Sequence, residues 1–190
     1  MANERTKAVV AAAFCAVATW SSGATAEPAM VATVVAHVRD YQQVSHGELA
    51  AAQELASHVY EKIGVRLVWT GGSRVGPSTD RFLHVDVVLL DRVMTMRNNP
   101  EPKAFGDASH ATQRAYIYYP RILDHARHTR SDAVRVLALV FAHELGHVLL
   151  PEYSHSTSGL MRASWEGRLL YVPPFSAAQA EAIRATLATQ

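Results

Sequence analysis

The sequence predicts an α+β domain, from the order of its apolar patterns and from its composition. Runs of β-branched residues, typical of strands, alternate with segments of helical periodicity in the order β-α-β-β-β-α-α. Hydrophobic residues make up 49% of the 190 residues, which is enough for the core of a single domain. We therefore expect a twisted mixed sheet of about four to five strands, backed by two helices, with a small C-terminal part.

Strands are expected where β-branched or aromatic residues cluster. Four such segments lie at 31–39, 65–70, 82–90 and 114–119. Residues 92–113 read as a long link between the last two strands, and Asn98–Pro102 within it reads as a loop. Residues 103–109 in the same link could pair as a short edge strand, although an exposed loop explains the pattern equally well.

Three helices are expected, and two of them begin with capping boxes. The first runs from Ser45 to about Ile63, and the last begins at Ser176. The buried face of the last helix consists of Ala180, Ile183 and Leu187. Between them, residues 131–150 are predicted to form a helix with Ser131 as its N-cap. This middle helix is apolar on more than one side, so we expect it to be buried on most sides.

The middle helix contains His143-Glu144-Leu145-Gly146-His147, an H-E-x-x-H motif. Histidines four residues apart share one face of a helix, so both imidazoles can bind one metal ion. Glu144 lies beside them, where it can take a proton from metal-bound water. Zinc is the usual ion, and hydrolysis of a peptide bond is the usual chemistry. The alternative is two buried histidines bonded to carbonyl groups, with Glu144 in a salt bridge.

A third ligand is expected from the segment after the helix. Pro151 ends the helix, and the chain must then turn. A catalytic zinc ion has three protein ligands and one open position, which makes His155 the obvious third ligand. Glu152 and Tyr153 remain alternatives, and so does Glu166 if the ligand comes from further along the chain. Residues 158–161 then read as a tight turn that carries a methionine.

Residues 143–165 resemble the metzincin clan of zinc peptidases, and more closely a group of short secreted bacterial metzincin-like proteins. The matching residues are His143 to Leu150, His155, Ser156, Gly159, Leu160, Met161, Arg162, Ala163 and Trp165. The resemblance implies that His155 is the third ligand and that Met161 forms an apolar floor beneath the metal. It also implies a substrate cleft between the two parts of the domain. An edge strand would line that cleft and bind the substrate backbone, and Ala104, Phe105 and Gly106 are the candidates for it.

The chain also departs from the clan pattern, H-E-x-x-H-x-x-G-x-x-H. Leu150 stands in place of the glycine, and Tyr153 in place of the third histidine. His155 lies two residues further on, so the turn after the helix must be built differently. Ala163 occupies the position where some metzincins carry a tyrosine near the metal. The group that stabilises the oxyanion therefore stays unassigned beyond the zinc itself.

The first residues read as a secretory signal peptide. Arg5 and Lys7 precede an apolar stretch at residues 8–20, and Ala24-Thr25-Ala26 is an A-x-A cleavage site. We expect cleavage of 1–26 and a secreted or periplasmic domain at 27–190. Its upper part, 27–150, would hold the sheet and the zinc helix, and its lower part, 151–190, the third ligand and the final helix. An uncleaved N-terminal anchor is the alternative.

Charge and cysteine content restrict the partners. Without residues 1–26 the chain has equal numbers of acidic and basic residues, which gives no indication of a nucleic-acid or anionic-membrane partner. Cys15 is the only cysteine and lies in the predicted signal peptide, so the mature chain would have no disulfide. We expect a monomer that acts on a peptide or protein substrate.

Other histidines give weaker signals. His125 and His128 are three residues apart and could form a second site, although such a pair is more often solvated. Asp86 and Asp91 could bond to a metal-binding histidine, but the sequence does not place them.

These features together predict a secreted zinc-dependent endopeptidase. One catalytic Zn²⁺ would be bound by His143, His147 and His155, with Glu144 as general base. One alternative is a binding or adhesion module in which the zinc is structural and fully coordinated, although such a site has no use for Glu144. Another is a zinc hydrolase of non-peptide amides, which the motif does not separate from a peptidase.

Overall fold

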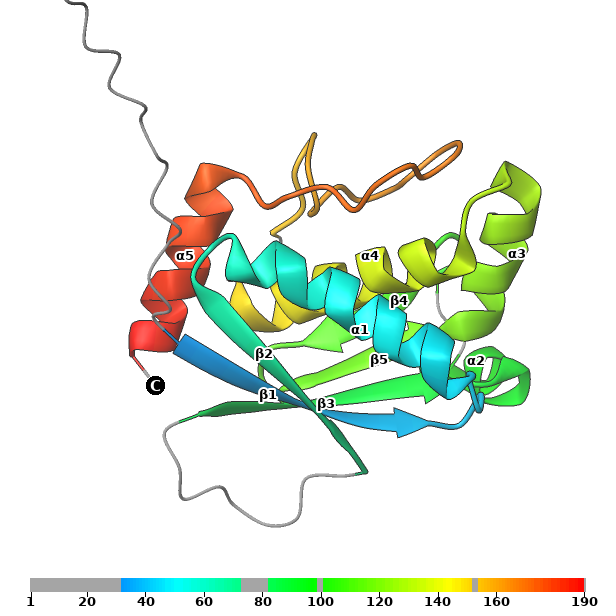
Figure 1. The fold of residues 1–190 in the computed structure, drawn as a ribbon, viewed down its shortest axis with the longest axis horizontal. Helices are drawn as coiled ribbons and strands as arrows, with labels where there is room; N and C mark the ends of the chain where they lie inside the picture. The colour runs from blue at the N-terminus through cyan, green and yellow to red at the C-terminus, as the bar shows by residue number, and fades with distance from the viewer. Residues whose placement is uncertain (1–31, 73–81, 99–100, 152–153, 190) are drawn as a thin grey trace, which may run out of the picture.

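The computed structural model describes residues 32–72, 82–98, 101–151 and 154–189 (Figure 1). The strands within these residues are β1 (Ala32–Asp40), β2 (Val65–Gly71), β3 (Leu83–Leu90), β4 (Gly106–Ser109) and β5 (Arg114–Tyr118). The helices are α1 (His46–Glu61), α2 (Arg92–Asn98), α3 (Tyr119–Thr129), α4 (Ala133–Leu149) and α5 (Ala177–Ala188). The predicted signal peptide lies outside the described residues.

The strands form one mixed sheet in the order β2-β1-β3-β5-β4. Neighbours from β2 to β5 are parallel, whereas β4 is antiparallel to β5 and lies at the edge of the sheet. The predicted α+β class and mixed sheet are therefore confirmed. The short edge strand expected within 103–109 also forms, but it begins at Gly106, and Ala104 and Phe105 precede it.

Helices α1 and α4 lie side by side over one face of the sheet (Figure 1). Alternate residues of the central strands point toward them and are buried, as β-strand geometry requires. On β3 these buried residues are Leu83, Val85, Val87 and Leu89. The opposite face is more polar and carries Asp86, which is paired with Arg39 and Arg114. Figure 1 also shows α5 beside the start of β1.

Helix α4 is buried on nearly every side, as its sequence predicts. From Val136 to Gly146 each of its residues is buried. The predicted N-cap is wrong by one position, because the carboxylate of Asp132 accepts the backbone N–H of Val134. The hydroxyl of Ser131 instead accepts the backbone N–H of Leu169, so it ties the start of the helix to the C-terminal part.

The predicted link at 92–113 is partly wrong, because residues 92–98 form helix α2. A second unpredicted helix, α3, follows β5 directly, so Tyr119 begins a helix rather than ending a strand. Pro120 in its first turn was the available signal, since proline favours the first positions of a helix. Helix α3 packs against α4 and β3.

The C-terminal part crosses α4 on the side away from the sheet and then forms α5 (Figure 1). The capping box at Ser176 is present, with both Ser176 and Gln179 side chains bonded to backbone N–H groups. Ala180, Ile183 and Leu187 are its buried residues, as predicted. Among the described helices, none has the length and apolarity needed to span a membrane.

Candidate metal centre and cleft

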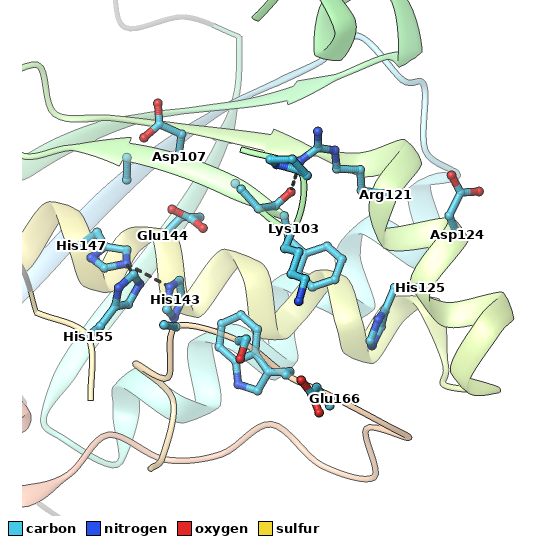
Figure 2. A pocket seen from close by; sticks show the side chains of 18 residues that line it. Lys103, Asp107, Arg121, Asp124, His125, His143, Glu144, His147, His155 and Glu166 are labelled. Atoms are coloured by element: carbon cyan, nitrogen blue, oxygen red, sulfur yellow. Dashed lines mark hydrogen bonds between the residues drawn. The ribbon is translucent and has the colours of Figure 1, made fainter. Parts of the chain in front are cut away.

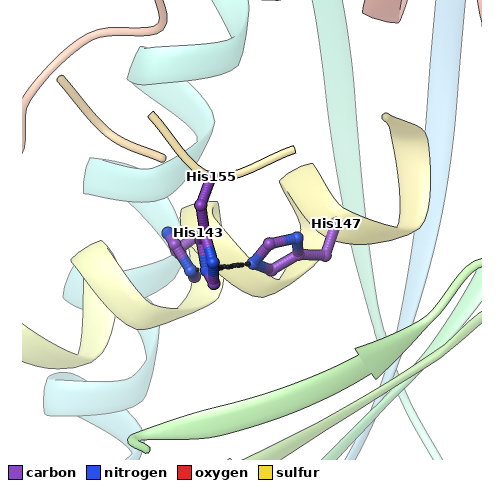
Figure 3. A group of neighbouring side chains, drawn as sticks. All are labelled: His143, His147 and His155. Carbon is purple, nitrogen blue, oxygen red and sulfur yellow. Dashed lines mark hydrogen bonds between the residues drawn. The ribbon is translucent and has the colours of Figure 1, made fainter. Parts of the chain in front are cut away.

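Three histidines from two segments converge on one point (Figure 3). His143 and His147 lie one turn apart on α4, and His155 comes from the segment after it. The Nε2 atom of His147 is 3.0 Å from Nε2 of His143 and 3.0 Å from Nε2 of His155. Ring nitrogens of all three lie within 4.8 Å of one another. The fold therefore brings together the three predicted ligands.

The ring nitrogens on the other side of two of these imidazoles have partners. His143 Nδ1 donates to the backbone carbonyl of Leu160 at 2.9 Å, since a carbonyl can only accept. His147 Nδ1 bonds to the hydroxyl of Ser154 at 3.0 Å. Such bonds fix the ring orientation and leave Nε2 as the ligand atom.

Burial keeps the two helix histidines neutral. Desolvation lowers the pKa of His143 to about 3, although its bond to the Leu160 carbonyl opposes this. Desolvation also lowers the pKa of His147 to about 4, with a smaller contribution from His155. A metal binds the neutral imidazole, so both groups are in the ligating form throughout the neutral range. His155 is exposed.

These residues fit a zinc ion. Tetrahedral zinc with bonds of about 2.0–2.1 Å to nitrogen separates its ligand atoms by roughly 3.3–3.4 Å, close to the distances found here. Hydrogen bonding alone explains the convergence less well. His143 carries its proton on Nδ1, and a proton on His147 Nε2 could serve only one of its two neighbours. A divalent cation satisfies all three nitrogens.

The alternative ligands fall into two groups. Glu152 and Tyr153 lie outside the described residues. Glu166 is exposed and lines the same cavity, but it does not belong to the group of converging ligand atoms. His125 and His128 form no metal-binding group with other described residues.

Glu144 is buried next to the histidines, and its side chain lines the cavity. Desolvation raises its pKa to about 8, and the nearby charge of Asp107 adds to the rise. Among the described residues, Glu144 forms no salt bridge that would account for its burial, contrary to the alternative weighed from the sequence. A cation held by the three histidines would favour the ionised carboxylate.

Met161 is fully buried and packs against α4. It packs so tightly on α4 that a Cβ atom on Gly146 would lie 2.6 Å from its sulfur. The turn before it is closed by the Ser156 N–H, which donates to the Met161 carbonyl at 2.7 Å, and Gly159 adopts a positive φ of 75°. Gly146, which lies within the H-E-x-x-H motif, thus leaves the space that the Met161 side chain fills.

The histidines and Glu144 open onto a cleft of about 620 Å³ (Figure 2). Residues 102–108 line one side, including the predicted Ala104, Phe105 and Gly106, and residues 163–166 line the other. The sequence did not indicate that α3 closes one end, where Arg121, Asp124 and His125 lie. The ring of His125 meets that of Phe105 edge to face, with centroids 5.0 Å apart. His125 is thus a wall of the cleft, whereas His128 is exposed.

Trp165 forms the wall opposite β4, close to the first ligand. Its ring meets His143 edge to face, with centroids 4.6 Å apart. In the sequence, Trp165 was notable only as one of the residues that resemble the metzincin-like proteins. Its packing gives it a structural role in holding the imidazole of His143.

Comparisons with known proteins show similarity at the level of the fold. The chain is similar to archaemetzincin from Methanopyrus kandleri, with a TM-score of 0.52 and 16% sequence identity, over 83% of this chain and 96% of that one. A zinc-dependent peptidase from Methanocorpusculum labreanum matches with a TM-score of 0.44 and 15% identity, over 80% of this chain and 99% of that one. Comparison with protein-family models and with curated proteins gave no match. The chain therefore has the fold of archaemetzincin.

Proposed function

We propose that the protein is a zinc-dependent metallopeptidase of the metzincin type, which cleaves within peptide or protein chains. The observation that carries the proposal is the joint placement of three converging histidines and one buried carboxylate at the wall of a cleft. A purely structural zinc site gives no reason to bury Glu144 there, because burying a carboxylate is unfavourable. The fold shared with archaemetzincin supports the same function.

His143, His147 and His155 would hold the zinc ion. Zinc bound there would act as a Lewis acid on the scissile carbonyl and would make a water molecule acidic. Glu144 would take a proton from the attacking water and pass it to the leaving amine, so its carboxylate would act first as base and then as acid. The bonds to the Leu160 carbonyl and the Ser154 hydroxyl would hold the imidazoles of His143 and His147 in place.

The edge strand β4 would bind the substrate backbone. In an antiparallel pair, alternate residues direct their N–H and C=O groups toward the partner strand. Phe105 faces β5, because its carbonyl accepts the N–H of Tyr118 at 2.8 Å. Gly106 and Ala108, which are paired with Ile117 and Ala115, therefore direct their backbone groups to the free edge. An extended peptide could add to β4 there.

The segment that precedes β4, toward α3, cannot pair with a substrate backbone in the same way. The N–H of Ala104 donates to the Glu101 carbonyl at 3.0 Å, and the Ala104 carbonyl accepts from the guanidinium of Arg121 at 2.7 Å. Both backbone groups of Ala104 are thus already bonded. Of the predicted residues, Gly106 would bind the substrate backbone, whereas Ala104 and Phe105 would shape the wall of the cleft.

We also propose that the protein acts after export, because residues 1–26 have the features of a signal peptide. Cleavage by a signal peptidase near Ala26 can be checked by N-terminal sequencing of protein recovered from the medium or periplasm.

The test is cleavage of a mixed peptide library by the purified protein, read by mass spectrometry beside Glu144→Ala. We expect internal cuts made by the wild type and absent from the variant, with equal zinc content in both. Identical peptide profiles with zinc bound in both would contradict the peptidase and favour a structural site or a non-peptide amide as substrate. Cuts confined to chain ends would contradict endopeptidase action.

A further inference from the structure

We propose that Gly106 is a positioning residue, which sets the place of the Glu144 carboxyl group by lacking a side chain. Its contribution to catalysis rests on the proposed function, whereas its effect on the position of Glu144 does not. Gly106 is the first residue of β4, and Glu144 lies on α4, so the contact joins the edge strand to the helix that carries the histidines.

The contact is too close for any other residue. A Cβ atom on Gly106 would lie 2.5 Å from Glu144 Cγ, 2.5 Å from Oε1 and 2.6 Å from Cδ. Carbon atoms in contact prefer about 3.5–4.0 Å. Because Cγ is included, rotation of the carboxyl group alone would not remove the overlap. The whole end of the Glu144 side chain would have to move.

Backbone conformation does not explain the glycine. Gly64, Gly72, Gly159 and Gly167 have positive φ angles, which favour glycine, but Gly106 does not. Its backbone is in a conformation that alanine adopts without strain. Space beside Glu144 is therefore the property that only glycine provides at this position.

Neither backbone can easily move to relieve the overlap. Gly106 is paired with Ile117, which is fully buried, and the preceding Phe105 carbonyl is bonded to Tyr118. Helix α4 lies in the core, where the hydroxyl of Tyr60 donates to the Ala142 carbonyl at 2.9 Å. The cleft is the open side of Glu144. An alanine at position 106 should therefore push the carboxyl group into the cleft and leave the fold intact.

The experiment compares Gly106→Ala with Gly71→Ala. Gly71 ends β2 at the opposite edge of the same sheet, and a Cβ atom there would have no heavy atom within 4 Å. For each zinc-loaded protein we would measure zinc content, thermal midpoint, kcat and KM, and determine the crystal structure. We expect Gly106→Ala to keep its zinc and its KM while kcat falls roughly a hundredfold, because misplacing a catalytic group by about 1 Å has effects of that size. Gly71→Ala should match the wild type.

A second pair of variants tests whether the effect acts through Glu144. Glu144→Ala removes Cγ, Cδ and Oε1, which are the atoms that the new Cβ would meet. Gly106→Ala should therefore lower the thermal midpoint of the wild type and leave that of the Glu144→Ala protein nearly unchanged, as a double-mutant cycle would reveal. Equal reductions in both backgrounds would overturn the proposal. So would loss of zinc from Gly106→Ala, or a raised KM with kcat unchanged.

The crystal structures separate this proposal from the proposed function. A displaced Glu144 carboxyl in Gly106→Ala supports the positioning role even if neither protein cleaves any peptide, in which case the peptidase alone fails. A carboxyl group that stays in its wild-type position overturns the positioning role even if the wild type is an active peptidase.

Discussion

The metal centre is built from two halves that are held in different ways. The helix half consists of His143, Glu144 and His147 on α4, and the core of the domain surrounds it. The segment half consists of residues 154–161, and its ligand His155 is exposed. The core fixes the spacing of the first two imidazoles, whereas short-range bonds of a turn place the third. Substitution of a metal ligand should therefore lower zinc affinity by different amounts in the two halves.

The bonds that hold the segment half reach into the rest of the C-terminal part. The Leu160 N–H donates to the Pro174 carbonyl at 3.0 Å, and the Gln179 side chain donates to the hydroxyl of Ser156 at 3.1 Å. Gln179 is also part of the capping box of α5. The placement of the third ligand is thus coupled to the helix that ends the chain.

Removing one ligand from each half is the strongest test of this comparison. His147→Ala leaves two ligands on separate segments, whereas His155→Ala leaves two ligands that α4 still holds together. We expect zinc affinity to fall by about a thousandfold in His147→Ala and about a hundredfold in His155→Ala, because structural zinc sites derive roughly 10–16 kcal/mol from four ligands. Competition with a chelator measures both. Affinity lower in His155→Ala than in His147→Ala would contradict the comparison.

The same division explains how much of the site could be predicted from the sequence. Helical periodicity predicts that His143, Glu144 and His147 lie close together, and α4 is a regular helix that places them so. The position of His155 depends on a turn that neither periodicity nor propensity describes, so it had to be inferred from zinc chemistry and from the resemblance. Its neighbours Glu152 and Tyr153 could not be excluded on those grounds.

The walls of the cleft show a further limit. Phe105 precedes β4 and His125 lies on α3, yet their rings are in contact. Trp165, in the C-terminal part, contacts the ring of His143. Such contacts between distant segments depend on packing, which one sequence does not reveal. Local signals performed better, since the capping box of α5 and four of the five strands were predicted. Helix α3 was missed although Pro120 marked its first turn.

The pH dependence of stability tests the burial of the helix half. The pKa of Glu144 is raised in the folded protein to about 8 from an ordinary value of 4.5. The folded state therefore binds more protons than the unfolded state between these values, and the stability contributed by protonated Glu144 is lost as the pH rises toward 8. Glu144→Gln removes this dependence.

For the metal-free proteins, we therefore expect Glu144→Gln to gain stability over the wild type between pH 5 and pH 8. The gain should be about 3–4 kcal/mol, because each of the roughly three pH units inside the window contributes up to about 1.4 kcal/mol. His143 and His147, whose pKa values are lowered to about 3 and 4, act in the opposite direction below pH 6.5. Their effect is present in both proteins and cancels. If the free energies of unfolding of the two proteins, measured in urea, changed in parallel with pH, Glu144 would not be buried as described.

Gly146→Ala tests the junction between the two halves. The new Cβ would lie 2.6 Å from the Met161 sulfur and 3.2 Å from an edge carbon of Phe175. Overpacking of this kind is unfavourable by about 1–3 kcal/mol, and the better helix propensity of alanine offsets up to about 1 kcal/mol. We expect a net loss of about 1–2 kcal/mol in urea unfolding. Gly47→Ala, near the start of α1 with no heavy atom within 4 Å of its Cβ, is the control and should be neutral or stabilising. Equal effects would show that Met161 does not pack against α4.

Ser154→Ala should have the smallest effect, and it sharpens the comparison most directly. His143 is oriented by the backbone carbonyl of Leu160, which side-chain substitution does not remove, whereas His147 is oriented by the Ser154 hydroxyl. Loss of such a partner typically reduces metal affinity by about 10- to 100-fold. We expect about tenfold here, because Ser154 is only half-buried and water can replace its hydroxyl.

Ser158→Ala is the matched control for Ser154→Ala, since Ser158 lies on the same segment and its bond to Ser156 uses its backbone carbonyl, which alanine retains. Unchanged zinc affinity in Ser154→Ala would mean that the helix alone orients His147. The segment half would then contribute to the centre only through His155 and the Leu160 carbonyl. A tenfold loss, absent from Ser158→Ala, would instead show that the exposed half of the site also orients a ligand of the buried half.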